Sequence, residues 1–506
     1  MISRTALFYV ALTYIGAHAL ANNGTEGQEI QWGPCTLNTS VPVECGNVTV
    51  PLDYSTPNST ATLDIELLRV RATNQPSKGS ILYNPGGPGG SGQSRLADRA
   101  TQLLEYTGGY HDLISFDPRG VGKTMPFLCS QTPLDKQLVD LKFPQDSGNA
   151  SDTTLGELWG NMGIRAELCK VKGGDIGELL GTAFVARDLM RIVDALGEDG
   201  MLRYWGISYG SVLGATAAAM FPDRMDRVII DGVTNIHQYW HDSEIDMVAA
   251  VDESFSSFLA SCVEAGPDKC PLARNNISAP DLEDKIYAFI EDDLKYNPFA
   301  SNGELVTYHM ARYEFIFKYL YDPAKFPALA ELLDGILTRN TSVLDARFTD
   351  ASGSDALNVD ARDAIWCADK TIRANSLEEM RPTIEDRLYP TSRAVGDTWA
   401  FFALTCPQWQ MEAKERYLGD YNVRTRHPML VIGNTFDPVT PLVSARNASE
   451  TFEGSVLLHY NSHGHGSLRQ ESRCQKKAVQ AYFLNGTLPE PGTICEPDAP
   501  LKDVFQ

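Results

Sequence analysis

The sequence predicts an α/β protein: a mostly parallel sheet covered by helices on both faces, with a large, mainly helical domain inserted into it. Two observations indicate this class. Short apolar runs alternate with helical patterns near both ends of the chain, and the middle of the chain lacks such runs. With 506 residues, 43% of them hydrophobic, the chain can bury one large core and a second, inserted one.

The first strands are marked by short apolar runs that lead into glycine-containing loops. Ser80–Asn84 precedes NPGGPGGSG, and Leu113–Phe116 precedes DPRGVG, as expected of buried parallel strands. Between Ala183 and Gly197, apolar residues recur at helical spacing. The next expected elements are a strand at Leu202–Trp205, an alanine-rich helix at Ser211–Met220 and a strand at Val228–Ile230.

The pattern changes from about Asn235 to Arg426, where long, charged, mainly helical segments predominate. Strand-like runs return at Met429–Gly433 and Val456–Tyr460. We therefore expect core segments at 22–234 and 427–506, and an inserted helical cap at 235–426.

The N-terminus has the features of a secretory signal peptide. An apolar run, Ala6–Ile15, is followed by small residues and the A-x-A pattern Ala19-Leu20-Ala21. We expect residues 1–21 to be removed after Ala21. The run is shorter than the roughly 20 residues that span a bilayer, so a secreted protein without a membrane span is predicted.

Cysteines and glycosylation sequons indicate the same compartment. The ten cysteines fall as near neighbours, which favours five disulfides: Cys35 with Cys45, Cys129 with Cys169, Cys262 with Cys270, Cys367 with Cys406, and Cys474 with Cys495. Sequence alone does not prove this pairing. Nine N-x-S/T sequons lie at Asn23, Asn38, Asn47, Asn58, Asn149, Asn276, Asn340, Asn447 and Asn485.

Charge and motif content exclude several function classes. A net charge of −22 argues against a nucleic-acid partner, because no basic region is concentrated enough to neutralise phosphates. The chain has no C-x-x-C, and its H-x-x-x-H, His237 to His241, lacks the glutamate of a metalloprotease helix. We expect no metal and no cofactor. The oligomeric state is not predicted.

Gly206-Ile207-Ser208-Tyr209-Gly210 matches the G-x-S-x-G turn, in which a nucleophilic serine lies between a strand and a helix. The pentapeptide alone is weak evidence, but a predicted strand precedes it and a predicted helix follows it. No second G-x-S-x-G occurs in the chain. Ser208 is therefore the expected nucleophile, and an α/β-hydrolase fold is the expected architecture.

Such a serine requires a histidine base and an acid, which follow it in the order Ser, Asp, His in this fold. Asp437 comes just after the MLVIG strand, where the acid should emerge. Of the histidines beyond it, His459 lies inside a predicted strand. His463 and His465 share a glycine-containing loop, and we favour His465, with His463 as a surface loop residue.

Backbone amides are expected to stabilise the oxyanion. The glycine-rich loop after Ser80–Asn84 can supply one amide, from Gly87 or alternatively Gly86, and Tyr209 can supply the other. The loop could instead cradle a phosphate, but no lysine follows in P-loop spacing.

The motifs NPGGPGGSG, FDPRGVG, GISYGS, VIIDGV, GNTFDPVTP and GHGS, in this order, resemble the tripeptidyl-aminopeptidase-like branch of the prolyl-aminopeptidase type of serine peptidases. The resemblance extends from about Cys35 to Cys495. It implies an α/β-hydrolase core, a helical cap, and a triad at Ser208, Asp437 and His465. Relatives with HGGPG at the oxyanion loop differ, because Asn84-Pro85 stands there in this chain.

Three hypotheses for function follow. The first is an extracellular exopeptidase that releases short N-terminal peptides or residues through an acyl-enzyme; the second is an esterase or tailoring hydrolase acting on a small metabolite. The third, a catalytically silent binding protein, is disfavoured by the intact triad. An aminopeptidase needs a carboxylate for the substrate α-amine, and Glu244 and Glu253 at the start of the cap are the candidates.

Overall fold

The structure, a computed structural model, describes residues 29–37, 39–130, 132–301, 303–340 and 358–506. The predicted signal peptide and the sequons at Asn23 and Asn38 lie outside these residues. Among the described residues, no helix combines the length and the apolar character needed to cross a membrane.

A ten-stranded sheet forms the centre of the described chain, in the order β1-β2-β3-β5-β4-β6-β7-β10-β11-β12. The first three strands pair antiparallel, and β3 also pairs antiparallel with β5. From β5 to β12 all neighbours are parallel. The strands are β1 Gly33–Pro34, β2 Val43–Pro51, β3 Thr62–Val70, β4 Ser80–Asn84, β5 Asp112–Phe116, β6 Leu202–Ser208, β7 Met225–Val233, β10 Leu430–Phe436, β11 Val456–His463 and β12 Ile494–Cys495.

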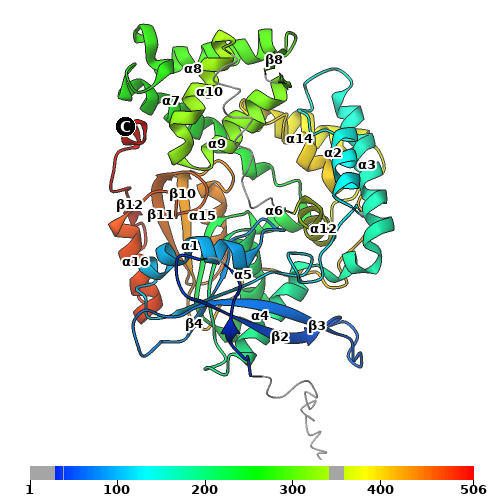
Figure 1. The fold of residues 1–506 in the computed structure, drawn as a ribbon, viewed down its shortest axis with the longest axis vertical. Coiled ribbons are helices and arrows are strands. Elements are labelled where there is room, and N and C mark those ends of the chain that lie inside the picture. The colour runs from blue at the N-terminus through cyan, green and yellow to red at the C-terminus, as the bar shows by residue number, and fades with distance from the viewer. Residues whose placement is uncertain (1–28, 38, 131, 302, 341–357) are drawn as a thin grey trace, which may run out of the picture.

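Alternate strand residues point to opposite faces of the sheet, so each face has its own apolar core. On β6, for example, Tyr204 packs into one core and Trp205 into the other. Helices α1 (Gly92–Tyr106) and α16 (Arg473–Asn485) cover the Trp205 face. The Tyr204 face is covered by α4 (Thr182–Ala195), α5 (Tyr209–Met220) and α15 (Leu442–Thr451) (Figure 1). The predicted doubly covered parallel sheet is therefore confirmed.

The segment between β7 and β10 forms a helical layer above the carboxyl ends of the strands (Figure 1). In the part of this segment that the structure describes, the α-helices of five residues or more are α6 Ile236–His241, α7 Val251–Ala265, α8 Ala279–Ala288, α10 Phe326–Thr338, α12 Val359–Asp369, α13 Leu377–Arg381 and α14 Ala400–Thr405, with π-helical turns at Phe289–Leu294, Met310–Phe317 and Pro382–Leu388. It also contains the short helix α9 (Lys318–Leu320) and a small hairpin, β8 (Phe299–Ser301) and β9 (Glu304–Val306).

A second part of the chain joins this layer. Helices α2 (Pro133–Lys142) and α3 (Thr154–Gly173) lie beside α12 and α14 rather than on the sheet (Figure 1). Arg165 on α3 donates to Asp360 on α12 at 2.8 Å and to Asp363 at 3.0 Å. All three side chains are buried, so the pairs tie the N-terminal segment firmly to the cap. The sequence pattern placed this segment in the core, because its helices lack any marker of their packing partner.

The ten cysteines form five disulfides, in the five nearest-neighbour pairs expected. Cys367–Cys406 joins α12 to the end of α14, and Cys129–Cys169 joins the chain before α2 to α3. Together with Cys262–Cys270, which joins α7 to the chain that follows it, these bridges cross-link the layer that covers the strand ends. The seven sequon asparagines within the described residues are all exposed, so each is accessible to glycosylation.

Candidate active site

Ser208 stands at the junction of β6 and α5, in a backbone conformation that L-residues rarely adopt. Its φ is 60° and its ψ is −125°, which costs on the order of 1–3 kcal/mol in a non-glycine residue. The flanking glycines are required by close contacts. A Cβ at Gly210 would lie 2.4 Å from the carbonyl oxygen of Asn84, and one at Gly206 would lie 2.1 Å from that of Gly210. The turn therefore holds the Ser208 side chain away from the sheet.

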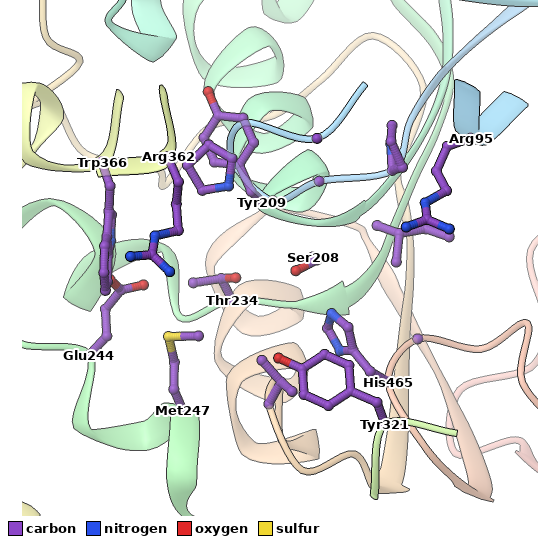
Figure 2. A pocket seen from close by; sticks show the side chains of 18 of the residues that line it. Arg95, Ser208, Tyr209, Thr234, Glu244, Met247, Tyr321, Arg362, Trp366 and His465 are labelled. Atoms are coloured by element: carbon purple, nitrogen blue, oxygen red, sulfur yellow. The ribbon is translucent and has the colours of Figure 1, made fainter. Parts of the chain in front are cut away.

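Asp437 and His465 meet at the carboxyl ends of the next strands. Asp437 directly follows β10, and His465 follows β11. Nδ1 of His465 lies 3.1 Å and 3.2 Å from the two carboxylate oxygens of Asp437. Figure 2 shows the His465 imidazole directed toward Ser208, and both residues line the same pocket. The structure thus brings the three predicted residues together.

The Asp437 carboxylate is completely buried and surrounded by hydrogen-bond donors. One oxygen accepts from the amides of Val439 and Thr440, both at 2.9 Å. The other accepts from the Thr440 hydroxyl at 2.8 Å and from the Gly466 amide at 2.9 Å. Burial alone would raise the pKa of Asp437, but the charge and hydrogen bond of His465 and these amides hold it below its ordinary value. Asp437 is therefore an anion that orients His465.

The other two candidate histidines, His459 and His463, form hydrogen bonds with residues outside the triad. His463 is not a surface loop residue, as the sequence suggested, but the buried last residue of β11. Its ring stacks on Phe436 at 4.2 Å, and its Nε2 lies 2.7 Å from the hydroxyl of Ser257. Burial lowers the pKa of His463 to about 4, so it stays neutral. His459 lies inside β11 and pairs with the Thr435 hydroxyl at 2.7 Å.

The glycine-rich loop after β4 passes close to Ser208. A Cβ at Gly86 would lie 2.8 Å from the Cβ of Ser208 and 2.9 Å from the amide nitrogen of Tyr209. The Gly86 amide already donates to the side chain of Asn84, at 2.9 Å. Gly87 also lines the pocket. The expected oxyanion donors from this loop were Gly87 and, alternatively, Gly86. Because the Gly86 amide already donates to Asn84, Gly87 is the better candidate.

The pocket over Ser208 has a volume of about 370 Å³. The cap contributes much of its wall, and most of the cap residues that line it are aromatic: Tyr239, Glu244, Met247, Tyr313, Phe317, Tyr321, Arg362, Trp366, Trp399 and Phe402. Figure 2 shows Glu244, Met247, Arg362 and Trp366 together on one side of Ser208, with Arg95 on the other. The cap therefore encloses the site on the side of Glu244.

The structure separates the two glutamates proposed from sequence. Glu244 lines the pocket, is 2% exposed, and has a φ of 52°. Its Oε2 accepts from Trp366 at 2.5 Å and pairs with Lys370 at 2.6 Å. Glu253 is exposed on α7 and is not among the pocket-lining residues, so it does not fit the role of an amine ligand. Its acidic neighbours made it resemble Glu244 in sequence, but the chain turns between the two positions.

The sequence analysis did not identify several of the residues that line the pocket. Trp366 and Arg362 lie on α12, far from every motif, and only the folded cap brings them to Ser208. Arg95 and Arg99 are spaced by four residues on the helix that follows the glycine-rich loop, and Arg469 closely follows His465. These three arginines lie close in sequence to the glycine-rich loop or to His465, and that closeness could have identified them.

A second buried carboxylate supports the loop that carries His465. Asp231 on β7 accepts from the amide of Ser467 at 3.0 Å, from its hydroxyl at 2.6 Å, and from Trp205 at 3.1 Å. Burial raises the pKa of Asp231 from 3.8 to about 6, and these donors and the nearby charge of Asp437 modify that shift. Because the folded-state pKa is raised, ionisation of Asp231 destabilises the fold as the pH rises from about 4 to 6.

Asp231→Asn should therefore destabilise the protein more at pH 4 than at pH 7. The variant loses hydrogen bonds at both pH values, but only the wild type carries the ionisation cost at pH 7. A shift of roughly two pKa units corresponds to about 3 kcal/mol between the two conditions. Urea unfolding of both proteins at both pH values measures this difference. A loss of stability that is the same at pH 4 and pH 7 would contradict it.

Comparisons with known proteins agree with this geometry. A family model described as "alpha/beta hydrolase fold" matches residues 79–266, and one described as "TAP-like protein" matches residues 392–495. The tripeptidyl aminopeptidase of Streptomyces lividans is 28% identical over 492 residues, covering 93% of this chain and 87% of its own. Serine protease Hip1 of Mycobacterium tuberculosis is 27% identical, covering 97% and 96%. Carboxylesterase B of the same organism is 27% identical, covering 90% and 86%.

The parallel sheet covered on both faces, the serine turn after β6 and the inserted cap define the class: the protein is an α/β-hydrolase. Within that class, the family model and the relatives support a TAP-like α/β-hydrolase, as the motif resemblance implied.

Proposed function

We propose that this chain is a secreted serine exopeptidase that releases short N-terminal peptides or single residues through an acyl-enzyme on Ser208. The observation that carries the proposal is a buried carboxylate, Glu244, on the enclosed side of the pocket that contains Ser208 and His465. Names of relatives support a peptidase, and the five disulfides and N-terminal sequence support export.

The chemistry follows from the positions of the side chains. His465 takes the proton of the Ser208 hydroxyl, whose oxygen attacks the scissile carbonyl carbon. The amides of Gly87 and Tyr209 donate to the resulting oxyanion. His465 then gives its proton to the leaving amine as the carbon–nitrogen bond breaks. Water, activated by the same histidine, attacks the acyl-enzyme and releases the N-terminal product and free Ser208.

Glu244 suits an α-amine because one of its oxygens is unoccupied. Both protein contacts, from Trp366 and Lys370, are made to Oε2. Oε1 accepts no hydrogen bond from the described residues, so it can accept one from a substrate ammonium group. A charge-assisted bond of this kind is strong where water is largely excluded. The unusual backbone of Glu244, like that of Ser208, is consistent with a functional position.

Glu244→Gln should lower kcat/KM for peptides with a free N-terminus by about tenfold or more, because it replaces a charge-assisted bond with a neutral one. Hydrolysis of a simple aryl ester should change far less, since the triad is intact. Glu253→Gln is the matched control and should leave both activities near the wild-type level. Equal losses on ester and peptide would indicate a structural role for Glu244 instead.

An esterase acting on a small metabolite is the second candidate. It is favoured by the aromatic lining of the pocket, and a relative of similar identity is named Carboxylesterase B. The two candidates are separated by the wild-type enzyme's rates on free and N-acetylated peptides and on aryl esters. Cleavage of acetylated peptides as fast as free ones would exclude the exopeptidase and favour the esterase.

A further inference from the structure

Three of the four arginines that line the pocket lie near one another, in a chain whose net charge is −22. Arg95 and Arg99 lie one helical turn apart on α1. Arg469 lies in the chain that follows His465, and its Nε donates to the carbonyl oxygen of His465 at 3.3 Å. Figure 2 shows Arg95 and Glu244 on opposite sides of Ser208. We call Arg95, Arg99 and Arg469 the arginine site.

The arginine site brings positive charge to a part of the pocket that has no carboxylate in its lining. Among the described residues that line the pocket, Glu244 is the one carboxylate, and it lies on the other side. Arg469 pairs with Asp322 at 2.9 Å, outside the lining. Burial, and then the positive charges of Arg99 and Arg95, lower the pKa of Arg469, while Asp322 opposes this shift, so the other two arginines act on Arg469 as nearby positive charges. Like charges gathered around a cavity favour an anionic ligand there.

His465 determines which part of a peptide reaches these arginines. In acyl transfer the histidine gives its proton to the leaving amine, so the leaving part of the substrate lies beside the imidazole. Arg469 is attached to the His465 backbone through a hydrogen bond. The amine-binding candidate Glu244 lies across Ser208 from Arg95 (Figure 2), so we assign its side of the pocket to the acyl part of the substrate. The fourth arginine of the lining, Arg362, lies on the same side of Ser208 as Glu244 (Figure 2). Its Nε and Nη2 donate to the carboxylate of Asp363.

We propose that the arginine site binds a carboxylate on the leaving part of the substrate; this inference rests on the proposed exopeptidase function. The planar guanidinium fork matches the two oxygens of a carboxylate. Two sources supply this group: an Asp or Glu side chain just after the scissile bond, or the C-terminal carboxylate of a short leaving peptide. The pocket then recognises a substrate at both ends, with an amine at Glu244 and an anion at the arginines.

Four peptides with one acyl sequence and a free N-terminus test this. The first leaving residue is Glu or Gln, and each peptide is made as the free acid and as the C-terminal amide. We expect a carboxylate from at least one source to raise kcat/KM about tenfold over the uncharged peptide. The Glu/Gln ratio reports the side chain, and the acid/amide ratio reports the C-terminus. Added salt should reduce whichever ratio is large.

Variants connect the preference to the arginine site. In the wild type, the Glu/Gln ratio or the acid/amide ratio of kcat/KM is expected to be large. Arg99→Gln should bring that ratio toward one. Arg99→Lys, which keeps the positive charge but not the guanidinium fork, should retain part of the preference. Arg473→Gln is the matched control, because Arg473 is an exposed α16 arginine that pairs with Asp498 and is not among the pocket-lining residues. It should keep the wild-type ratio. A ratio that falls equally in Arg99→Gln and Arg473→Gln would overturn the assignment.

The outcomes separate this inference from the function on which it rests. If the enzyme cleaves all four peptides at equal rates, or prefers the uncharged ones, the arginine site is overturned and the exopeptidase stands. If it cleaves an aryl ester but none of the peptides, both are overturned.

Discussion

Ser208→Ala and His465→Ala should each lower kcat/KM by roughly 10³- to 10⁶-fold, because the triad acts as a unit and loss of either member disables proton transfer and attack together. The geometry supports this expectation: His465 is hydrogen-bonded to Asp437 and directed toward Ser208. Steady-state rates on an aryl ester and on a free-amine peptide measure the effect. A fluorophosphonate probe should label Ser208 in the wild type and leave the Ser208→Ala variant unlabelled.

His463→Ala is the control for His465→Ala. It removes a neutral, buried histidine that contacts Phe436 and Ser257 instead of the triad. We expect reduced thermal stability, since a buried ring is lost, but turnover close to that of the wild type. The reverse pattern, with turnover kept in His465→Ala and lost in His463→Ala, would transfer the base to His463. Labelling of any residue other than Ser208 would exclude the nucleophile assignment.

The sequence predicted those parts of the protein in which local pattern and local chemistry coincide. The apolar runs at Ser80–Asn84 and Leu113–Phe116 form β4 and β5, because a buried parallel strand must be apolar on both faces. The G-x-S-x-G turn was recognisable because close contacts exclude side chains at Gly206 and Gly210. These requirements are local in the chain, so a single sequence contains them.

The sequence did not predict features that depend on distant segments. The antiparallel pair β2 and β3 was missed, because its half-exposed strands lack a continuous apolar run. The burial of His463 depends on Phe436 of β10 and Ser257 of α7, which are adjacent only after folding. Trp366 reaches Glu244 in the same way, across the cap. Such contacts have no periodicity or spacing that one sequence could reveal.

Asp437→Asn should lower kcat by about 10⁴-fold with little change in KM, because it alters the tautomer of His465 and not the binding surface. The hydrogen-bond donors around the Asp437 carboxylate determine the orientation of the side-chain amide that replaces it. Its oxygen can still accept from the amides of Val439 and Thr440, which places the NH₂ group toward Gly466 and His465. Nδ1 of His465, 3.1 Å from the position of that oxygen and 3.2 Å from that of the NH₂ group, then faces a donor as well as an acceptor, and we expect it to accept from the NH₂ group. The proton moves to Nε2, which can no longer accept the proton of Ser208.

Asp231→Asn is the matched control for this effect, since it also neutralises a completely buried carboxylate at a neighbouring strand. Asp231 contacts Ser467 and Trp205 but not His465, so its loss affects the loop and leaves the imidazole tautomer unchanged. We expect a far smaller decrease in kcat for Asp231→Asn than for Asp437→Asn. Comparable decreases in the two variants would show that removal of buried charge, and not the orientation of His465, accounts for the loss.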